Sequence, residues 1–117
     1  MTELSFVEHH QGWAEIVMNR PERRNSLVPA LAEEITSHLQ SLEEQAGVES
    51  IILRGNEGYF CSGIDLKALQ DPDTPRGTGN EMREMHLALY HCRKPVIAAL
   101  EKFAINAGIQ CKMELQS

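Results

Sequence analysis

The stretch PALAEEITSHLQSLEEQAGVESIIL, residues 29–53, decides the fold of this chain. Its first part repeats apolar residues at helical spacing and turns glutamate and serine away from them. Pro29 suits the first turn of a helix, and Gly47 is a favoured C-terminal stop. Residues 48–53 are a short apolar run rich in β-branched side chains, which is typical of a buried strand. The helix stripe consists of Leu31, Ile35, Leu39 and Leu42.

The sequence before this stretch predicts a β-hairpin. Residues 5–8 and 13–18 have the pattern of short strands, and Gln11-Gly12 suits the turn between them. Pro21 ends the second strand because proline cannot donate a hydrogen bond to the ladder. Strand, helix and strand joined by short links indicate a right-handed crossover between parallel strands.

The second half continues the alternation of helices and strands. We expect a short helix over residues 64–69, a loop over residues 71–80 and a helix over residues 81–93 that buries Met82, Met85 and Leu89. Residues 96–100 predict a buried strand, and residues 103–105 predict a further short extended piece. The fold class is therefore α/β, in one domain by length.

Composition excludes several functions. The 117 residues carry a net charge of −6, which argues against a general nucleic-acid binder. No apolar run reaches the length of a membrane span, and residues 1–10 have no signal-peptide pattern. Three widely spaced cysteines favour a reducing compartment, so we expect a cytoplasmic protein, with a mitochondrial or peroxisomal location as the alternative in a eukaryote. The five histidines have no metal-binding spacing, so no metal site is predicted.

Two segments of small residues have the pattern of ligand-binding turns. Cys61-Ser62-Gly63 and Asn106-Ala107-Gly108 each follow an extended apolar piece and precede an expected helix. Two backbone amides that converge on one carbonyl oxygen form an oxyanion hole, with donors about 2.7–3.1 Å from the oxygen. From spacing alone, two unrelated tight turns are the alternative.

Three ordered segments carry a resemblance to a known family. They are NRPERRNSL at 19–27, GYFCSGIDL at 58–66 and KPVIAALEKFAINAG at 94–108. Together they resemble the N-terminal signature segments of the crotonase family, the enoyl-CoA hydratases and isomerases. The likeness reaches to about Gly108. It implies a crotonase-type α/β fold, a superhelix of repeated β-β-α units, of which residues 1–117 are an incomplete, apparently truncated domain, the N-terminal half.

The resemblance also implies a substrate and a mechanism. Family members bind an acyl-CoA thioester, in lyase or isomerase reactions of fatty acid metabolism, and need no separate cofactor because coenzyme A is part of the substrate. By position in the motifs, Ser62 and Ala107 would donate the two oxyanion-hole amides. Gly63, Ile64 and Asp65 would line the thioester and pantetheine side, and Gly108 would border the substrate.

Charged residues near the motifs have two interpretations each. Arg20, Arg23, Arg24 and Lys67 are a basic group in an acidic chain, suited to CoA phosphates. A solvated basic turn is the alternative. Asp65 lies in the first turn of the expected helix, where a carboxylate caps the helix without any catalytic role. Asn25 is expected to bond the backbone of its own turn.

The chain departs from the family pattern at Gln110, where hydratases typically carry a glutamate. Glutamine orients water but does not exchange a proton near neutral pH. The second family glutamate lies beyond Ser117. Complete members are homotrimers or hexamers. Three hypotheses therefore stay open: an enoyl-CoA hydratase or isomerase, a non-catalytic relative that binds acyl-CoA or another subunit, and an inactive fragment. The 117-residue chain alone is expected to be inactive.

Overall fold

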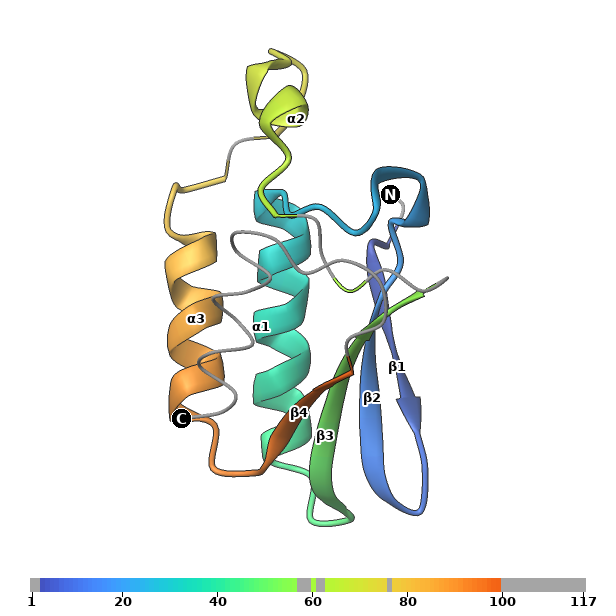
Figure 1. Cartoon of the computed structure of the whole chain (residues 1–117). Coiled ribbons are helices and arrows are strands. Elements are labelled where there is room, and N and C mark those ends of the chain that lie inside the picture. The colour runs from blue at the N-terminus through green and yellow to red at the C-terminus, as the bar shows by residue number, and fades with distance from the viewer. Residues whose placement is uncertain (1–2, 57–59, 61–62, 76, 100–117) are drawn as a thin grey trace.

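A computed structural model describes residues 3–56, 60, 63–75 and 77–99. The strands are β1 (Ser5–His9), β2 (Gly12–Met18), β3 (Val48–Gly55) and β4 (Val96–Ala99). The helices are α1 (Pro29–Glu43), α2 (Leu66–Gln70) and α3 (Glu81–His91), and a 3-10 turn, η1, spans Pro21–Arg23. The described chain is mixed α/β, as the sequence predicts (Figure 1).

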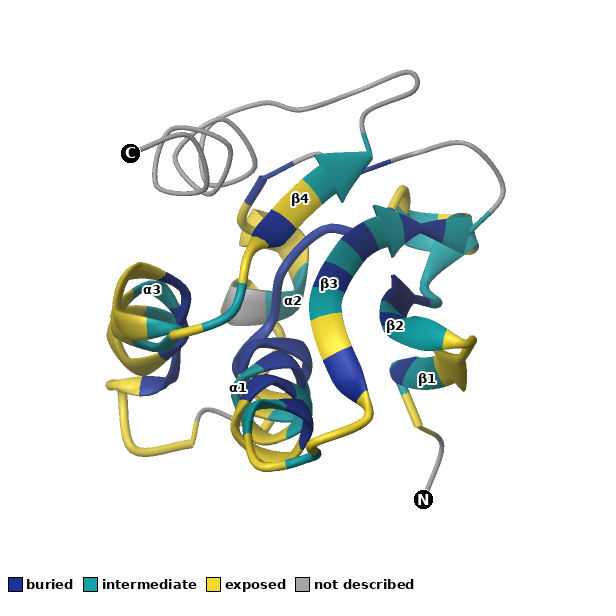
Figure 2. Cartoon of the chain, turned by 90° about the horizontal axis from the view of Figure 1, so that it is seen from below, coloured by how far each residue is buried: buried dark blue, intermediate teal, exposed yellow. Residues whose placement is uncertain are grey.

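The four strands form one sheet in the order β1-β2-β3-β4. β1 and β2 are the predicted antiparallel hairpin, with Phe6 opposite Val17. β2 and β3 are parallel, and so are β3 and β4, with Leu53 opposite both Ile16 and Ala98. α1 connects β2 to β3, and α2 and α3 lie in the connection from β3 to β4. α1 and α3 lie side by side on one face of the sheet (Figures 1 and 2).

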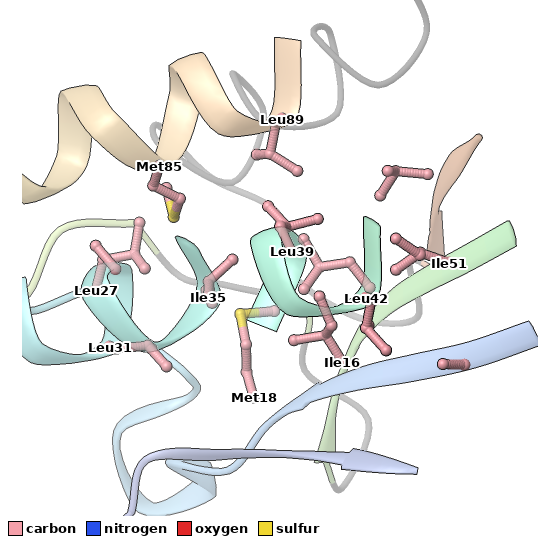
Figure 3. Close-up of a cluster of buried hydrophobic side chains, with 14 of the residues drawn as sticks. Ile16, Met18, Leu27, Leu31, Ile35, Leu39, Leu42, Ile51, Met85 and Leu89 are labelled. Carbon is pink, nitrogen blue, oxygen red and sulfur yellow. The ribbon is translucent and has the colours of Figure 1, made fainter. Parts of the chain in front are cut away.

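The core fills the space between this face of the sheet and the two long helices (Figure 3). The helix stripe expected from the sequence is confirmed, because each of its four residues is at most 1% exposed. Met85 and Leu89 of α3 are buried as predicted, and Met82 is partly buried against them. The inward residues of the sheet are Ala14, Ile16, Met18, Ile51 and Leu53.

The expected strands 5–8, 13–18 and 48–53 are each one or two residues longer in the structure, and two helix boundaries and one expected burial are also wrong. The helix predicted from residue 64 begins at Leu66, because Ile64 is extended and bridges Leu27. The helix predicted to residue 93 ends at His91, two residues before the Lys94-Pro95 step that disfavours helix. The last strand is only partly buried. Ile97 is 56% exposed, because β4 is the outermost strand of the described sheet and this side chain points away from the helices' face.

Polar contacts fasten the ends of α1. At its C-terminus, the Lys94 ammonium donates to the carbonyls of Leu42 (2.7 Å) and Gln45 (2.5 Å). Both carbonyls also accept from backbone amides, of Gln45 and Val48 respectively, so the ammonium is an additional donor that places a cation at the negative end of the helix dipole. Near the other end, the Glu34 carboxylate accepts from the Ser5 hydroxyl at 2.6 Å. The Ser5 contact ties α1 to β1, and the Lys94 contacts tie its C-terminal end to the segment that leads into β4.

Candidate functional site

The first two motif segments meet in a short parallel bridge between Leu27 and Ile64. The Leu27 amide donates to the Gly63 carbonyl at 2.7 Å, and the Asp65 amide donates to the Leu27 carbonyl at 2.8 Å. Gly63 is buried and has φ +100°, a conformation that side-chain-bearing residues rarely adopt. This backbone conformation, in a buried position, favours glycine at residue 63.

This bridge sets the direction of the Ile64 amide. The Gly63 carbonyl and the Ile64 N–H belong to one planar trans peptide group, so they point in opposite directions. The carbonyl faces Leu27, and the N–H therefore faces away from it. Within the described part of the chain, no group accepts a hydrogen bond from this N–H. Ile64 thus presents a backbone donor on the side of the bridge opposite the first motif.

The loop of the first motif is held in an unusual conformation. Arg24 and Asn25 have φ of 51° and 56°, the left-handed region in which residues other than glycine are uncommon. Asn25 is fully buried, and its side-chain oxygen accepts from the Arg20 amide at 2.7 Å. The expectation that Asn25 bonds the backbone of its own turn is confirmed. The turn directs the basic side chains of this segment toward the start of α2.

The Asp65 carboxylate is the centre of the contacts between the two segments. It accepts from the Arg23 guanidinium at 2.7 Å and from the Arg20 guanidinium at 3.2 Å. The Ser26 hydroxyl donates at 3.2 Å and the Ala68 amide at 2.9 Å. The last contact makes Asp65 the N-cap of α2, so the capping role expected from the sequence is confirmed.

The electrostatic state of Asp65 follows from these donors. Burial alone would raise the pKa of this carboxyl, because its side chain is only 3% exposed. The Ala68 amide and the two guanidinium groups outweigh burial and lower the pKa to about 2. Asp65 is therefore ionised throughout the physiological range and neutralises part of the positive charge of the loop.

A pocket of about 530 Å³ opens beside this ion pair. Cationic side chains on its wall come from Arg23, Arg24 and Lys67, and Glu22 and Asp65 supply the carboxylates. Ile64, which is 43% exposed, also lines the pocket. In a chain of net charge −6, this is a local excess of positive charge next to an apolar residue. Such a surface suits a ligand that is anionic at one end.

The structure brings together five of the site residues that the sequence singled out: Arg23, Arg24, Gly63, Ile64 and Asp65. Ser62, Ala107, Gly108 and Gln110 lie outside the described residues. Sequence reasoning missed Ser26 as a partner of Asp65, since nothing in the local pattern links residues 39 positions apart. It noted Arg20 only as a cation, whereas the structure gives it a carboxylate partner.

The strand order places the carboxyl ends of β3 and β4 at the same edge of the sheet. β3 and β4 are adjacent and parallel, and Arg54 near the end of β3 lies opposite Ala99 at the end of β4. The chain leaves both strands at the same edge of the sheet. Segments that follow the carboxyl ends of neighbouring parallel strands are where α/β proteins commonly bind ligands.

A second cluster of polar residues lies on the hairpin. One ligand atom from each of Glu8, His10 and Glu15 falls within 4.8 Å of the others. Arg54 forms ion pairs with both glutamates, and His10 bonds Glu15 at 2.8 Å. Because the arginine already compensates these carboxylates, we interpret the cluster as a surface ion-pair network. No helix in the described part of the chain has the length and apolarity needed to cross a membrane.

Comparison with known proteins identifies the class. The family model for enoyl-CoA hydratase/isomerase matches residues 8–115. A mitochondrial protein of Dictyostelium discoideum, named as a probable enoyl-CoA hydratase, is 33% identical over 84% of this chain and 35% of its own length. A peroxisomal Delta(3,5)-Delta(2,4)-dienoyl-CoA isomerase of Arabidopsis thaliana is 34% identical over 80% of this chain and 39% of its own length.

Solved structures agree with the sequence comparisons. An enoyl-CoA hydratase/isomerase from Xanthobacter autotrophicus Py2 superposes with a TM-score of 0.85 at 30% identity, over 97% of this chain and 44% of that one. The crotonase-type α/β fold predicted from the motifs is thereby confirmed. The chain belongs to the enoyl-CoA hydratase/isomerase family. It spans between a third and two fifths of the length of the two curated relatives above.

Proposed function

We propose that this chain carries the acyl-CoA-binding part of an enoyl-CoA hydratase or isomerase. The proposal rests on one observation above all: the Ile64 N–H has no acceptor among the described residues, and the same residue lines a pocket that carries three cationic side chains. A thioester needs a donor for its carbonyl oxygen, and coenzyme A needs cations for its phosphates. Family membership supports this pairing, since relatives are named for acyl-CoA substrates.

The proposed chemistry is stabilisation of an enolate-like oxyanion. When a thioester is attacked or loses an α-proton, negative charge develops on its carbonyl oxygen, and backbone amides directed at that oxygen stabilise the transition state. The direction of the Ile64 N–H favours this residue as the first donor, in place of Ser62. Ala107 stays our proposal for the second donor, because its segment follows β4 as the other follows β3.

Phosphate recognition is proposed for the rim of the pocket. Arg24 and Lys67 line it together with Arg23, whose guanidinium contacts Asp65 while its side chain stays 39% exposed. Guanidinium groups match phosphate oxygens in geometry as well as charge. The acyl and pantetheine parts would then extend past Ile64 toward the edge of the sheet.

Gln110 limits which reaction the chain can support. A glutamine at the usual acid/base position leaves hydration without that proton donor, which favours acyl-CoA binding without turnover as the second candidate function. Homotrimeric or hexameric assembly of a complete protein and a cytoplasmic location stay predictions. The two relatives described above carry mitochondrial and peroxisomal names.

Calorimetric titration of the chain with CoA and with 3′-dephospho-CoA tests phosphate recognition. We expect Arg24→Gln and Lys67→Gln each to weaken CoA binding about fivefold, the effect of roughly 1 kcal/mol per partly solvated charge. Glu43→Gln, at the opposite end of α1, is the matched control and should bind as the unmodified chain does. Absence of CoA binding at millimolar concentration would refute the proposed function.

The oxyanion donor is tested by polarisation of a bound thioester. Infrared difference spectra of acetyl-CoA labelled at the thioester carbonyl should show a lowered stretching frequency on binding. Ile64→Pro removes the N–H and should remove this shift, whereas Ile64→Val keeps the N–H and should retain it. A shift that survives Ile64→Pro and disappears with Ser62→Pro would return the donor role to Ser62. In a complete protein, Gln110→Glu should raise the rate of crotonyl-CoA hydration if the proton donor is limiting.

A further inference from the structure

We infer that Asp65 is a positioning residue: its buried carboxylate holds the Gly63–Ile64 peptide in the direction that presents the Ile64 N–H to the ligand. The inference deepens the proposed function and depends on it only for what this amide binds. The structure assigns the role to a side chain that family resemblance would place among substrate contacts.

The Asp65 carboxylate is anchored by four donors from two segments of the chain. One oxygen accepts from Arg23 (2.7 Å) and from the Ala68 amide (2.9 Å), and the other accepts from Arg20 (3.2 Å) and Ser26 (3.2 Å). Three of these donors belong to the first motif segment and one belongs to α2. The carboxylate therefore joins two segments that are more than thirty residues apart in the chain, and all of its accepting directions are occupied.

The anchored Asp65 carboxylate is linked to the Ile64 amide through the backbone and through Leu27. Asp65 directly follows Ile64, and Ser26 directly precedes Leu27, the bridge partner of Ile64. The Ser26 hydroxyl donates to the Asp65 carboxylate at 3.2 Å, and the Asp65 amide donates to the Leu27 carbonyl at 2.8 Å. Two adjacent hydrogen bonds therefore join the same two segments. Rotating the Gly63–Ile64 peptide breaks the 2.7 Å bond from the Leu27 amide to the Gly63 carbonyl. The ion pairs hold Leu27 close enough to keep that bond formed.

Substitution of Asp65 by asparagine distinguishes the positioning role from helix capping. Asparagine is as good an N-cap as aspartate, because its side-chain oxygen still accepts from the amide at the start of the helix. It replaces the second oxygen with an NH₂ donor, which faces the donors Arg20 and Ser26 and cannot accept from them. Asp65→Asn therefore keeps the oxygen that accepts from Ala68 and Arg23, and it removes the negative charge and the oxygen that accepts from Arg20 and Ser26. A glycine on the other side of the peptide gives the freed segment room to rotate.

The experiment measures the direction and mobility of the Ile64 N–H by NMR on the 117-residue chain. In the unmodified chain, we expect the residual dipolar coupling of this N–H to fit the direction given by the bridge, with an order parameter of about 0.85, as in rigid backbone. In Asp65→Asn, the order parameter of Ile64 should fall below about 0.6, while the amides of β2 and β3 keep theirs. Glu43→Gln, which removes a partner of Arg93, is the matched control and should leave Ile64 unchanged.

Unchanged dipolar coupling and order parameter of Ile64 in Asp65→Asn would overturn the inference and leave Asp65 as a cap alone. If Asp65→Asn fails to fold, Arg23→Gln removes one guanidinium partner of Asp65 and keeps its carboxylate. The order parameter of Ile64 should then fall by a smaller amount. Titration of acetyl-CoA into the unmodified chain distinguishes the two proposals. A lower order parameter of Ile64 in Asp65→Asn supports the positioning role whether or not acetyl-CoA binds. If acetyl-CoA shifts no resonance of the unmodified chain, that result refutes only the proposed function.

Discussion

The lowered pKa of Asp65 predicts an acid-dependent loss of stability that one substitution removes. The ordinary pKa of this carboxyl, 3.8, applies to the unfolded chain, and the folded value is about 2. Because the folded pKa is the lower one, the ionised carboxylate stabilises the fold fully above the unfolded pKa. That stabilisation is lost as the pH falls toward the folded pKa.

The magnitude follows from the difference between the two pKa values. At about 1.36 kcal/mol per pKa unit, the ionised carboxylate contributes roughly 2 kcal/mol to the free energy of unfolding. Linkage then gives a loss of about 1 kcal/mol between pH 5.5 and pH 3, and of about 2 kcal/mol by pH 2. Other carboxylates also titrate in this range, so the informative quantity is the difference between the unmodified chain and Asp65→Asn.

Urea unfolding followed by circular dichroism at pH 5.5, 4 and 3 measures this difference. At pH 5.5, Asp65→Asn should be less stable than the unmodified chain, because both guanidinium groups lose their buried negative charge and Arg20 also loses its acceptor oxygen. The gap should narrow by about 1 kcal/mol at pH 3, since only the unmodified chain loses the Asp65 contribution. Parallel pH profiles for the two proteins would refute the reasoning and show that Asp65 has the same pKa in the folded and unfolded chains.

Three further predictions concern the fold that supports the site. Ile35→Ala opens a cavity between α1 and its neighbours and should lower the free energy of unfolding by about 2–5 kcal/mol. Gln40→Ala, at an exposed position of the same helix, should change it by less than about 0.5 kcal/mol. Equal effects of the two substitutions in urea unfolding would contradict the packing described. Lys94→Met removes the two hydrogen bonds from the ammonium group to carbonyls at the end of α1, and it should lower the free energy of unfolding by about 1.5–3 kcal/mol in the same assay. An unchanged urea midpoint would mean that water replaces these hydrogen bonds without loss of stability. Burial lowers the pKa of His38, so its neutral form stabilises the fold and this contribution is lost as the pH falls below about 6.5. His38→Gln should flatten the change in melting temperature between pH 7.5 and 5.5, and an equally steep profile would argue against His38 as its source.

Local patterns in the sequence determined the elements and their order. The helical spacing of Leu31, Ile35, Leu39 and Leu42 predicts the buried face of α1, because a helix of this period must cover its apolar stripe. Alternation and the Gln11-Gly12 turn predict the hairpin, and the β-branched run after Gly47 predicts β3. The three motif segments predict the family, which the comparisons confirm. Each of these signals lies within one short stretch of chain.

Only the tertiary structure decided how the motif segments meet. Local periodicity does not encode the contact of Arg20 with Asp65, which joins residues 45 positions apart, or the bridge between Leu27 and Ile64. The sequence therefore predicted Asp65 as a cap and a substrate contact without its two arginine partners. Its prediction of Ser62 as an oxyanion donor stays a prediction, because Ser62 lies outside the described residues. The exposure of Ile97 likewise depends on β4 lying at the edge of the described sheet. The direction of a peptide group and the burial of a strand depend on which distant segments pair with it, so they are properties of the folded chain.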